Sequence, residues 1–113
     1  MLSKEFRLNK NIDIERTANR GRSFFARTLG IKYSPNRLQA SRFTVVVGLK
    51  VHKKSSKRNR PKRQLREILR KHLSEIKKGF DVVIVARKEI LDKKFQEIEK
   101  DLLYCFQKTQ LLK

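Results

Sequence analysis

The residues best suited to do chemistry are a run of cationic side chains between positions 50 and 63. The run holds eight lysines and arginines in fourteen residues, and it holds no acidic residue. A guanidinium group can donate two parallel hydrogen bonds to one phosphate, and a lysine adds a compact positive charge. The run therefore predicts a surface that binds phosphate groups.

An amphipathic helix is expected to carry the end of this run. Apolar residues recur there at the spacing of one helix face: Leu65, Ile68, Leu69, Leu73 and Ile76. At about 100° per residue, a polar stripe lies beside that face, formed by Asn59, Arg63, Arg66 and Arg70, with Lys62 near its edge. We expect a folded frame to hold these groups, so that they can follow a folded RNA backbone. The alternative is an ordinary solvated helix surface, although Glu67 offers only limited local pairing.

Composition supports a polyanionic partner. The 113 residues include 30 Lys and Arg against 11 Asp and Glu, which gives a formal net charge of +19. Each phosphate contact releases condensed counterions, so nucleic acid is favoured over a membrane surface. The hydrophobic share of 38% suffices for one core, and no apolar run is long enough to span a bilayer. We expect one domain over residues 1–113. Because residues 1–10 lack the apolar stretch of a secretory signal, we also expect a cytoplasmic location.

Residues typical of enzymes are sparse. The single cysteine, Cys105, falls on the apolar side of a helical pattern and is predicted to be a small core residue. His52 and His72 have no partner at metal-ligand spacing, and His72 is better explained as a histidine at the core edge than as a general base. No catalytic residue, metal ligand, bound cofactor or small-molecule substrate can be assigned.

The first half of the chain predicts a helix and two strands. Residues 11–20 form the helix, with Asp13 in its first turn and Gly21 as its stop. Residues 23–33 form a strand that Gly30 weakens or bulges, and residues 34–36 turn the chain. Residues 43–47 form a second strand, closed by Gly48, that we expect to pair with the first as an antiparallel hairpin.

The second half predicts a helix, a buried strand and a last helix. The basic helix should end near residues 77–79, and residues 80–86 form a strand covered on both faces. The last helix carries the apolar positions Leu91, Phe95, Ile98, Leu102, Cys105 and Phe106, with Asp92 as its N-cap. Together, these predicted helices and strands indicate a mixed α/β layer, with a three- or four-stranded sheet against about three helices.

Residues 50–67 resemble the signature segment of the bacterial ribonuclease P protein subunit. The hallmark of that family is an Arg-Asn-Arg helix preceded by a Ser-Lys-Lys loop. Here Arg58, Asn59 and Arg60 match the helix, while Lys53 and Lys54 match the loop after His52 in the place of the usual Ser. The resemblance extends to residues 6–8, 12–14, 21–27 and 80–87 and to the closing helix, and so covers nearly the whole chain.

This resemblance implies an α+β fold, a compact αβ sandwich like that of a ribosomal protein, with a left-handed βαβ crossover. In the family the catalyst is a large RNA that uses Mg²⁺ to remove the 5′ leader of precursor tRNA. The protein binds that RNA through its Arg-Asn-Arg helix and loop. It also contacts the single-stranded leader in a cleft between the first helix and the sheet, and it assists metal-dependent cleavage.

Two groups of site residues follow. The RNA-binding group is Lys53, Lys54, Arg58, Asn59, Arg60, Lys62, Arg63 and Arg66, to which the helix stripe adds Arg70. The leader-cleft group is Ile14, Ala18, Phe24, Arg27, Lys32 and Arg87.

Three departures from the family pattern matter. Ile14 and Ala18 replace residues that are often aromatic, which removes ring faces worth roughly 1–3 kcal/mol per stacked base. Phe24 or Tyr33 could supply a ring instead, although each is more often a core residue. Pro61 fits only a first helical turn comfortably, so we expect regular helix to begin near Arg60 or Pro61, or the helix to bend there.

Two other functions fit parts of the pattern. A general RNA-binding module, such as a ribosomal or nucleoid protein, would explain the charge and the sheet but not the ordered motif match. An enzyme acting without RNA would need a catalytic carboxylate that the sequence does not single out.

Overall fold

The computed structural model describes residues 3–113. Met1 and Leu2, which begin the segment predicted to lack a secretory signal, lie outside the described residues. Three α-helices and four strands follow in the order α1 (Asn11–Arg20), β1 (Arg22–Phe25), β2 (Leu29–Pro35), β3 (Arg42–Val46), α2 (Ser55–His72), β4 (Phe80–Ala86) and α3 (Phe95–Lys108). Short 3-10 turns occupy η1 (Lys4–Phe6), η2 (Leu73–Glu75) and η3 (Lys88–Ile90). Within residues 3–113, no helix is both long and apolar enough to cross a membrane.

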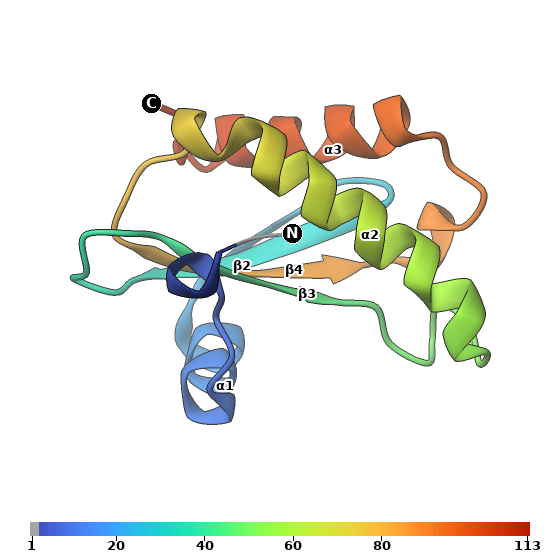
Figure 1. Ribbon diagram of the computed structural model, residues 1–113, viewed down its shortest axis with the longest axis horizontal. Helices are drawn as coiled ribbons and strands as arrows, with labels where there is room; N and C mark the ends of the chain where they lie inside the picture. The colour runs from blue at the N-terminus through green and yellow to red at the C-terminus, as the bar shows by residue number, and fades with distance from the viewer. Residues whose placement is uncertain (1–2) are drawn as a thin grey trace.

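The strands form one mixed sheet in the order β1-β2-β4-β3. Figure 1 shows α2 and α3 together on one face of this sheet and α1 on the other. The predicted α+β architecture, with a four-stranded sheet and three α-helices, is confirmed. One hydrophobic cluster joins the sheet to α2 and α3, with Ile31, Leu65, Ile84 and Leu102 all buried in it.

The pairing of β3 corrects the predicted hairpin. β2 pairs antiparallel with β4, and β3 pairs parallel with β4, so β2 and β3 are not neighbours. The apolar run of β4 needs cover on both faces and a strand on each side, and it takes the central position. Because α2 connects β3 to β4, the two strands and the helix form a crossover between parallel neighbours. The left-handed sense of that crossover stays a prediction.

A tight turn divides the single strand predicted over residues 23–33. β1 ends at Phe25, and the Ala26 amide donates to the Leu29 carbonyl at 2.8 Å before β2 begins. Phe25 then pairs with Gly30 across the hairpin. A Cβ atom on Gly30 would lie only 2.1 Å from the Phe25 ring, so Gly30 is the place where this ring packs onto the sheet. Gly30, which was predicted to weaken or bulge the strand, instead leaves room for the aromatic ring of Phe25.

Helix α2 is displaced towards the N-terminus compared with the prediction. It begins at Ser55 and ends at His72, where η2 continues the chain, and not near residues 77–79. Pro61 lies inside the helix with its ring buried, so a helix that begins at Arg60 or Pro61 is wrong. Pro61 has no N–H to give to the Lys57 carbonyl, but burial of its ring against the core offsets part of that loss.

The predicted start of the last helix also needs correction. The N-cap of α3 is Lys94, whose amide donates to Glu97 at 3.3 Å. Asp92 has a φ of 63° and belongs to the turn before the helix, since Asp tolerates the left-handed region better than most residues. Cys105 is fully buried on the inner side of α3, which confirms its predicted place in the core.

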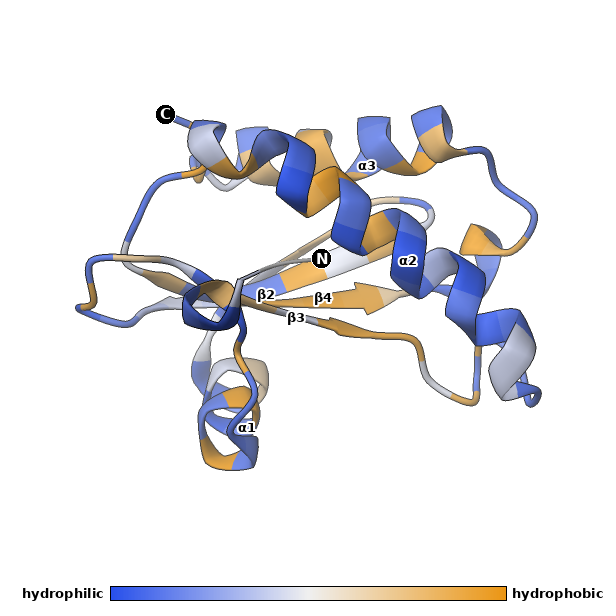
Figure 2. Ribbon diagram, viewed as in Figure 1, coloured by the Kyte–Doolittle hydropathy of each residue, from blue (hydrophilic) through white to orange (hydrophobic). Residues whose placement is uncertain are grey.

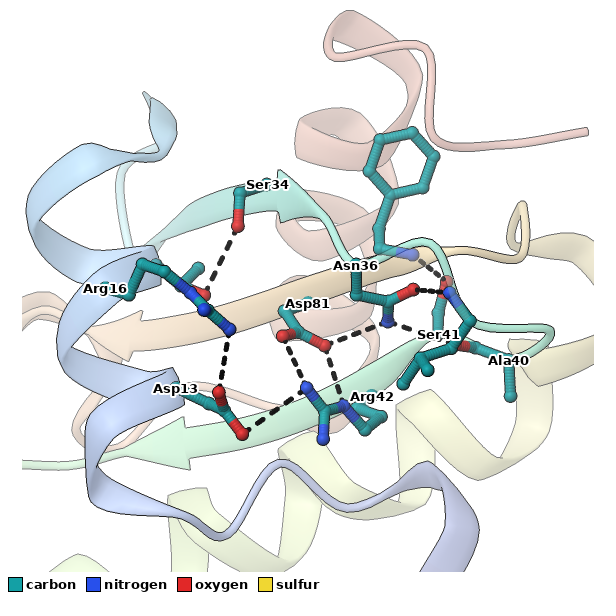
Figure 3. A network of polar contacts seen from close by, with 11 residues as sticks. Asp13, Arg16, Ser34, Asn36, Ala40, Ser41, Arg42 and Asp81 are labelled. Atoms are coloured by element: carbon teal, nitrogen blue, oxygen red, sulfur yellow. Dashed lines mark hydrogen bonds and ion pairs between the residues drawn. The ribbon is translucent and has the colours of Figure 1, made fainter.

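A buried carboxylate ties α1 and the β2–β3 connection to the sheet (Figure 3). Asp81 of β4 is buried, and Arg42 of β3 donates to both of its oxygens, at 2.9 and 2.7 Å. Asn36 donates to the same carboxylate at 2.9 Å. Arg42 also lies 3.5 Å from Asp13 of α1. One ionic network therefore fixes the position of α1 relative to β3 and β4.

His72 joins the end of α2 to α3. Its Nε2 lies 2.7 Å from Glu99, and its Nδ1 contacts Glu75. Lys71 adds an ion pair to Glu99 at 2.9 Å. Burial opposes protonation of the imidazole, but the hydrogen bonds to Glu99 and Glu75 outweigh that effect and raise the pKa of His72 above 6.5. The hydrogen bonds from His72 and Lys71 lower the pKa of Glu99.

These shifts predict a pH-dependent contribution to stability. Since the folded-state pKa of His72 exceeds its unfolded value, protonated His72 stabilises the fold fully below about pH 6.5 and loses this effect as pH rises through the folded pKa. We expect the difference in unfolding free energy between the native chain and His72→Gln to shrink with rising pH, as measured by urea unfolding. A difference that grows as pH rises would contradict this assignment.

Candidate nucleic-acid interface

A row of basic and polar side chains borders a hollow on the outer side of α2, here named the α2 hollow. Its volume is ≈ 370 Å³, and it is lined by Ser56, Asn59, Lys62, Arg63 and Arg66. Four of these five residues belong to the predicted RNA-binding group. None of the lining residues is acidic, so donors and positive charge face the hollow without local neutralisation.

The opposite side of α2 sets the direction of this row. Leu65, Ile68 and Leu69 are buried, with Leu65 and Leu69 at 0% exposure. At about 100° per residue, the stripe of Asn59, Arg63 and Arg66 lies beside this apolar face, with Arg66 nearest to it. Figure 2 shows the helix as mostly hydrophilic, interrupted by the hydrophobic positions that meet the sheet. Packing of the apolar face therefore aims the basic face at solvent.

The loop before α2 is held by two side chains. His52 Nδ1 accepts a hydrogen bond from the Lys54 amide at 3.0 Å. Arg58 donates through one nitrogen to the carbonyls of His52 and Lys53, both at 2.9 Å. Arg58 thus lies on the inner side of the helix and serves the loop, while Lys53 and Lys54 remain exposed. Sequence reasoning treated His52 only as a replacement for serine and missed this role.

Two other residues of the predicted group point elsewhere. Arg60 is exposed but lies about 100° round the helix from Asn59. Arg70 forms an ion pair with Glu67 at 2.9 Å, and this hydrogen bond lowers the pKa of Glu67 and raises that of Arg70. Arg70 does not line the α2 hollow. The structure therefore gathers Asn59, Lys62, Arg63 and Arg66 and separates the rest.

A second depression, here named the β3-edge groove, runs between α1 and α2 along the outer edge of β3, where the Leu8 amide donates to the Phe43 carbonyl at 2.8 Å. It has a volume of ≈ 370 Å³, and its lining includes Ile14 of α1, Thr44 and Val45 of β3, and Arg66 and Leu69 of α2. Arg66 lines both depressions. The two depressions are therefore neighbours on either side of the Arg66 side chain.

The predicted leader-cleft group is only partly gathered. Ala18 is half-buried one turn after Ile14, and Lys32 lies on the sheet face that α1 covers, because Ser34 of the same strand meets Thr17 at 3.4 Å. Phe24 lies on the other face. Its ring is partly buried 5.8 Å from that of Tyr104 in α3, so it packs against the core and does not line the cleft.

Arg27 and Arg87 lie at the far end of the sheet, away from the β3-edge groove. Arg27 is exposed in the β1–β2 turn, and Arg87 donates to the Ala26 carbonyl at 3.1 Å. Arg87 also stands 5.9 Å from the centre of the Phe25 ring, which is 44% exposed. Sequence reasoning missed Phe25. Strand alternation could have found it, because two consecutive phenylalanines must point to opposite faces.

Among residues 3–113, no group of three or more His, Cys, Asp or Glu side chains is placed to hold a metal ion. The role of Mg²⁺, expected through the RNA partner, stays a prediction.

Comparison with known proteins decides the family. A model of the ribonuclease P family matches residues 2–110. The chain belongs to the bacterial ribonuclease P protein family. It is 35% identical to the ribonuclease P protein component of Fusobacterium nucleatum, over 93% of this chain and 97% of that protein. It is 37% identical to the component of Clostridium botulinum strain Langeland, over 94% and 96%.

Solved structures agree with this membership. The ribonuclease P protein of Staphylococcus aureus superposes with a TM-score of 0.86 at 25% identity, covering 96% of this chain and 98% of that chain. The ribonuclease P protein of Thermotoga maritima gives 0.82 at 29% identity, covering 90% and 96%. Membership makes this chain the protein component of a tRNA-processing ribonucleoprotein endoribonuclease, with ribonuclease P RNA as its partner. A general RNA-binding module is no longer needed to explain the chain.

The loop contact of His52 gives a testable prediction. His52→Ala removes the acceptor for the Lys54 amide, so the loop loses one hydrogen bond worth about 0.5–1.5 kcal/mol, and RNA affinity should fall roughly two- to tenfold. His52→Asn keeps a side-chain acceptor and serves as the matched control, with near-native affinity in filter binding. Equal losses in both variants would show that the imidazole acts in another way.

Proposed function

We propose that this protein binds ribonuclease P RNA along the α2 hollow and the loop before it, and that the single-stranded 5′ leader of precursor tRNA occupies the β3-edge groove. The observation that carries the proposal is the shared wall of the two depressions, Arg66. A single rigid helix can in this way contact the RNA partner and the substrate at once.

The chemistry of the α2 hollow suits a folded RNA backbone. Arg63 and Arg66 can each donate two parallel hydrogen bonds to a phosphate, and Asn59 can use its amide with a phosphate or a base edge. Lys53 and Lys54 extend the charge into the loop that Arg58 holds. The apolar underside of α2 keeps these donors in place before RNA arrives, which lowers the entropic cost of binding.

The β3-edge groove offers the leader a different surface. Ile14, Val45 and Leu69 give it an apolar floor, while Arg7 and Arg66 provide cations within the same lining. Neither Ile14 nor Ala18 has a ring on which a base could stack, so leader binding should depend on phosphate contact and shape more than on stacking. Beyond Phe43, whose carbonyl accepts the Leu8 amide, the outer edge of β3 presents the backbone groups of Val45 to the leader.

The catalytic groups and the bound Mg²⁺ belong, in this proposal, to the RNA partner. The protein contributes positioning and positive charge, which keep leader and RNA together and reduce the Mg²⁺ needed for cleavage. The cytoplasmic location predicted from the sequence is part of the same proposal.

Replacement of the two arginines of the α2 hollow tests the proposal. Arg63→Ala with Arg66→Ala should leave the melting temperature near the native value, because both side chains are exposed. RNA binding should weaken, and the slope of log affinity against log salt should fall by about one unit per lost phosphate contact. Leu69→Ala is the comparator, since a buried cavity should cost about 2–5 kcal/mol of stability while the charge is kept.

The cleavage assay supplies the second arm of this test. Native protein should lower the Mg²⁺ requirement of its cognate ribonuclease P RNA and should favour precursor over mature tRNA, and the double variant should lose part of both effects. Equal binding of precursor and mature tRNA, with cleavage unaffected by the protein, would overturn the proposal.

A further inference from the structure

A second basic hollow lies on the far side of α1 from the β3-edge groove, and it is here named the α1 hollow. Its volume is ≈ 350 Å³, and its lining is Arg16 and Arg20 of α1, Ser34 and Pro35 of β2, and Asn36 and Arg37 of the following turn. Three arginines face one depression in which no lining residue is acidic. Neither the family motif nor the α2 hollow accounts for this arrangement.

One of the three arginines is held by the ionic network of the sheet (Figure 3). Arg16 donates to Asp13 at 2.7 Å, and the other oxygen of Asp13 lies 3.5 Å from Arg42. Arg42 is in turn bound by the buried Asp81. Asp13 is therefore shared between two guanidinium groups, and the region keeps an excess of positive charge. Arg16 retains N–H groups beyond the one given to Asp13.

The turn that carries Arg37 is also fixed. Arg37 has a φ of 60°, which is rare for a residue with a side chain. The side-chain oxygen of Asn36 accepts a hydrogen bond from the Leu38 amide at 2.7 Å. The side-chain nitrogen of Asn36 donates to the Ala40 carbonyl at 3.1 Å and to Asp81. A fixed turn of this kind holds the backbone of Arg37 in one place, and Asp13 holds the Arg16 side chain, so the hollow is partly formed before RNA binds.

Helix geometry separates this hollow from the proposed leader path. At about 100° per residue, Arg16 and Arg20 lie roughly 120–160° round α1 from Ile14 and Ala18. A strand seated in the β3-edge groove would have to wrap the helix to reach Arg20. The α1 hollow therefore meets a different stretch of backbone from the one that fills the groove.

We propose that the α1 hollow binds a phosphate group of an RNA backbone, as a second anchoring point on the sheet face opposite α2. This inference rests on the proposed function, in which the protein works bound to RNA. Guanidinium groups from two elements around one depression match the several oxygens of a phosphate, and two distant anchors fix the orientation of the protein in a complex better than one.

The test uses full-length protein with its cognate ribonuclease P RNA. Arg20→Ala with Arg37→Gly removes two exposed cations, and glycine accepts the backbone angle at position 37 without strain. Lys88→Ala with Lys100→Ala removes the same charge from exposed positions on η3 and α3 and is the matched control. We expect the slope of log affinity against log salt to become shallower by about one to two units in the first variant and by much less in the control. Equal changes in the two variants would overturn the inference.

The phosphate could belong to ribonuclease P RNA or to precursor tRNA, and measurements with each RNA distinguish the two. A slope change with ribonuclease P RNA alone assigns the phosphate to that RNA. A change that appears only when precursor tRNA joins the complex assigns it to the substrate. No change with either RNA overturns the inference. The proposed function fails independently, through the Arg63 and Arg66 variants, because those residues lie on the other face of the sheet.

A tethered probe can locate the contact directly. Leu38→Cys places a thiol at an exposed position beside the hollow and leaves all three arginines intact. Burial, with a smaller effect of Asp101, raises the pKa of the native Cys105 thiol to about 11, so a thiol-reactive iron chelate should modify the new cysteine selectively. Hydroxyl radicals from this site should cut one short stretch of RNA, and Lys100→Cys should give a different pattern or none. Cleavage that is absent or spread evenly along the RNA would contradict a defined phosphate contact.

Discussion

The packing of one side of α2 against the sheet is the interaction on which the rest of the molecule depends. Leu65, Ile68 and Leu69 are buried there, and because a helix is rigid, their burial determines where Asn59, Arg63 and Arg66 point. The free energy comes from apolar burial, at roughly 1.5–3 kcal/mol for each large side chain. Mutual repulsion among the cations opposes the fold only weakly by comparison, since their charges are exposed and screened. Burial of the apolar face of α2 therefore stabilises the helix that carries the basic surface.

A second constraint sets the position of α1 relative to β3 and β4. Asp81 is a charged group in the core, and it is tolerated because Arg42 and Asn36 satisfy both of its oxygens. Within residues 3–113, no buried side-chain nitrogen or oxygen lacks a hydrogen-bond partner. The same network holds Asp13 and through it Arg16. A groove on one side of α1 and a hollow on the other are therefore fixed by one carboxylate near the start of β4.

The basic helix and its apolar face could be predicted from the sequence because both depend on spacing within one element. The α1 helix, the buried β4 strand and the core position of Cys105 were predictable for the same reason. Strand pairing was not, because β2 and β3 are adjacent in sequence while β4, far along the chain, lies between them. Alternation places Phe24 and Phe25 on opposite faces of a strand, but it does not show which of the two rings faces the core.

The functional site shows the same contrast: spacing within one helix could be predicted, whereas contacts between separate segments could not. Helical spacing predicts the side chains that line the α2 hollow: Asn59, Lys62, Arg63 and Arg66. Arg58 instead points inward and holds a loop whose shape also depends on His52. Family resemblance supplied the cleft group, but Phe24 belongs to the core here. The α1 hollow could not be predicted from the sequence. Its arginines, Arg16, Arg20 and Arg37, come from two separate segments that only the network around Asp81 brings together.

We infer that the basic face of α2 is preformed and does not fold on meeting RNA. Amide hydrogen exchange of the protein without RNA tests this most directly, since slow exchange requires stable backbone hydrogen bonds. We predict that amides from Leu65 to Leu69 exchange as slowly as those of β4 in the free protein, and that adding ribonuclease P RNA changes their protection little. Fast exchange along α2 in the free protein, with protection gained only in the complex, would contradict it.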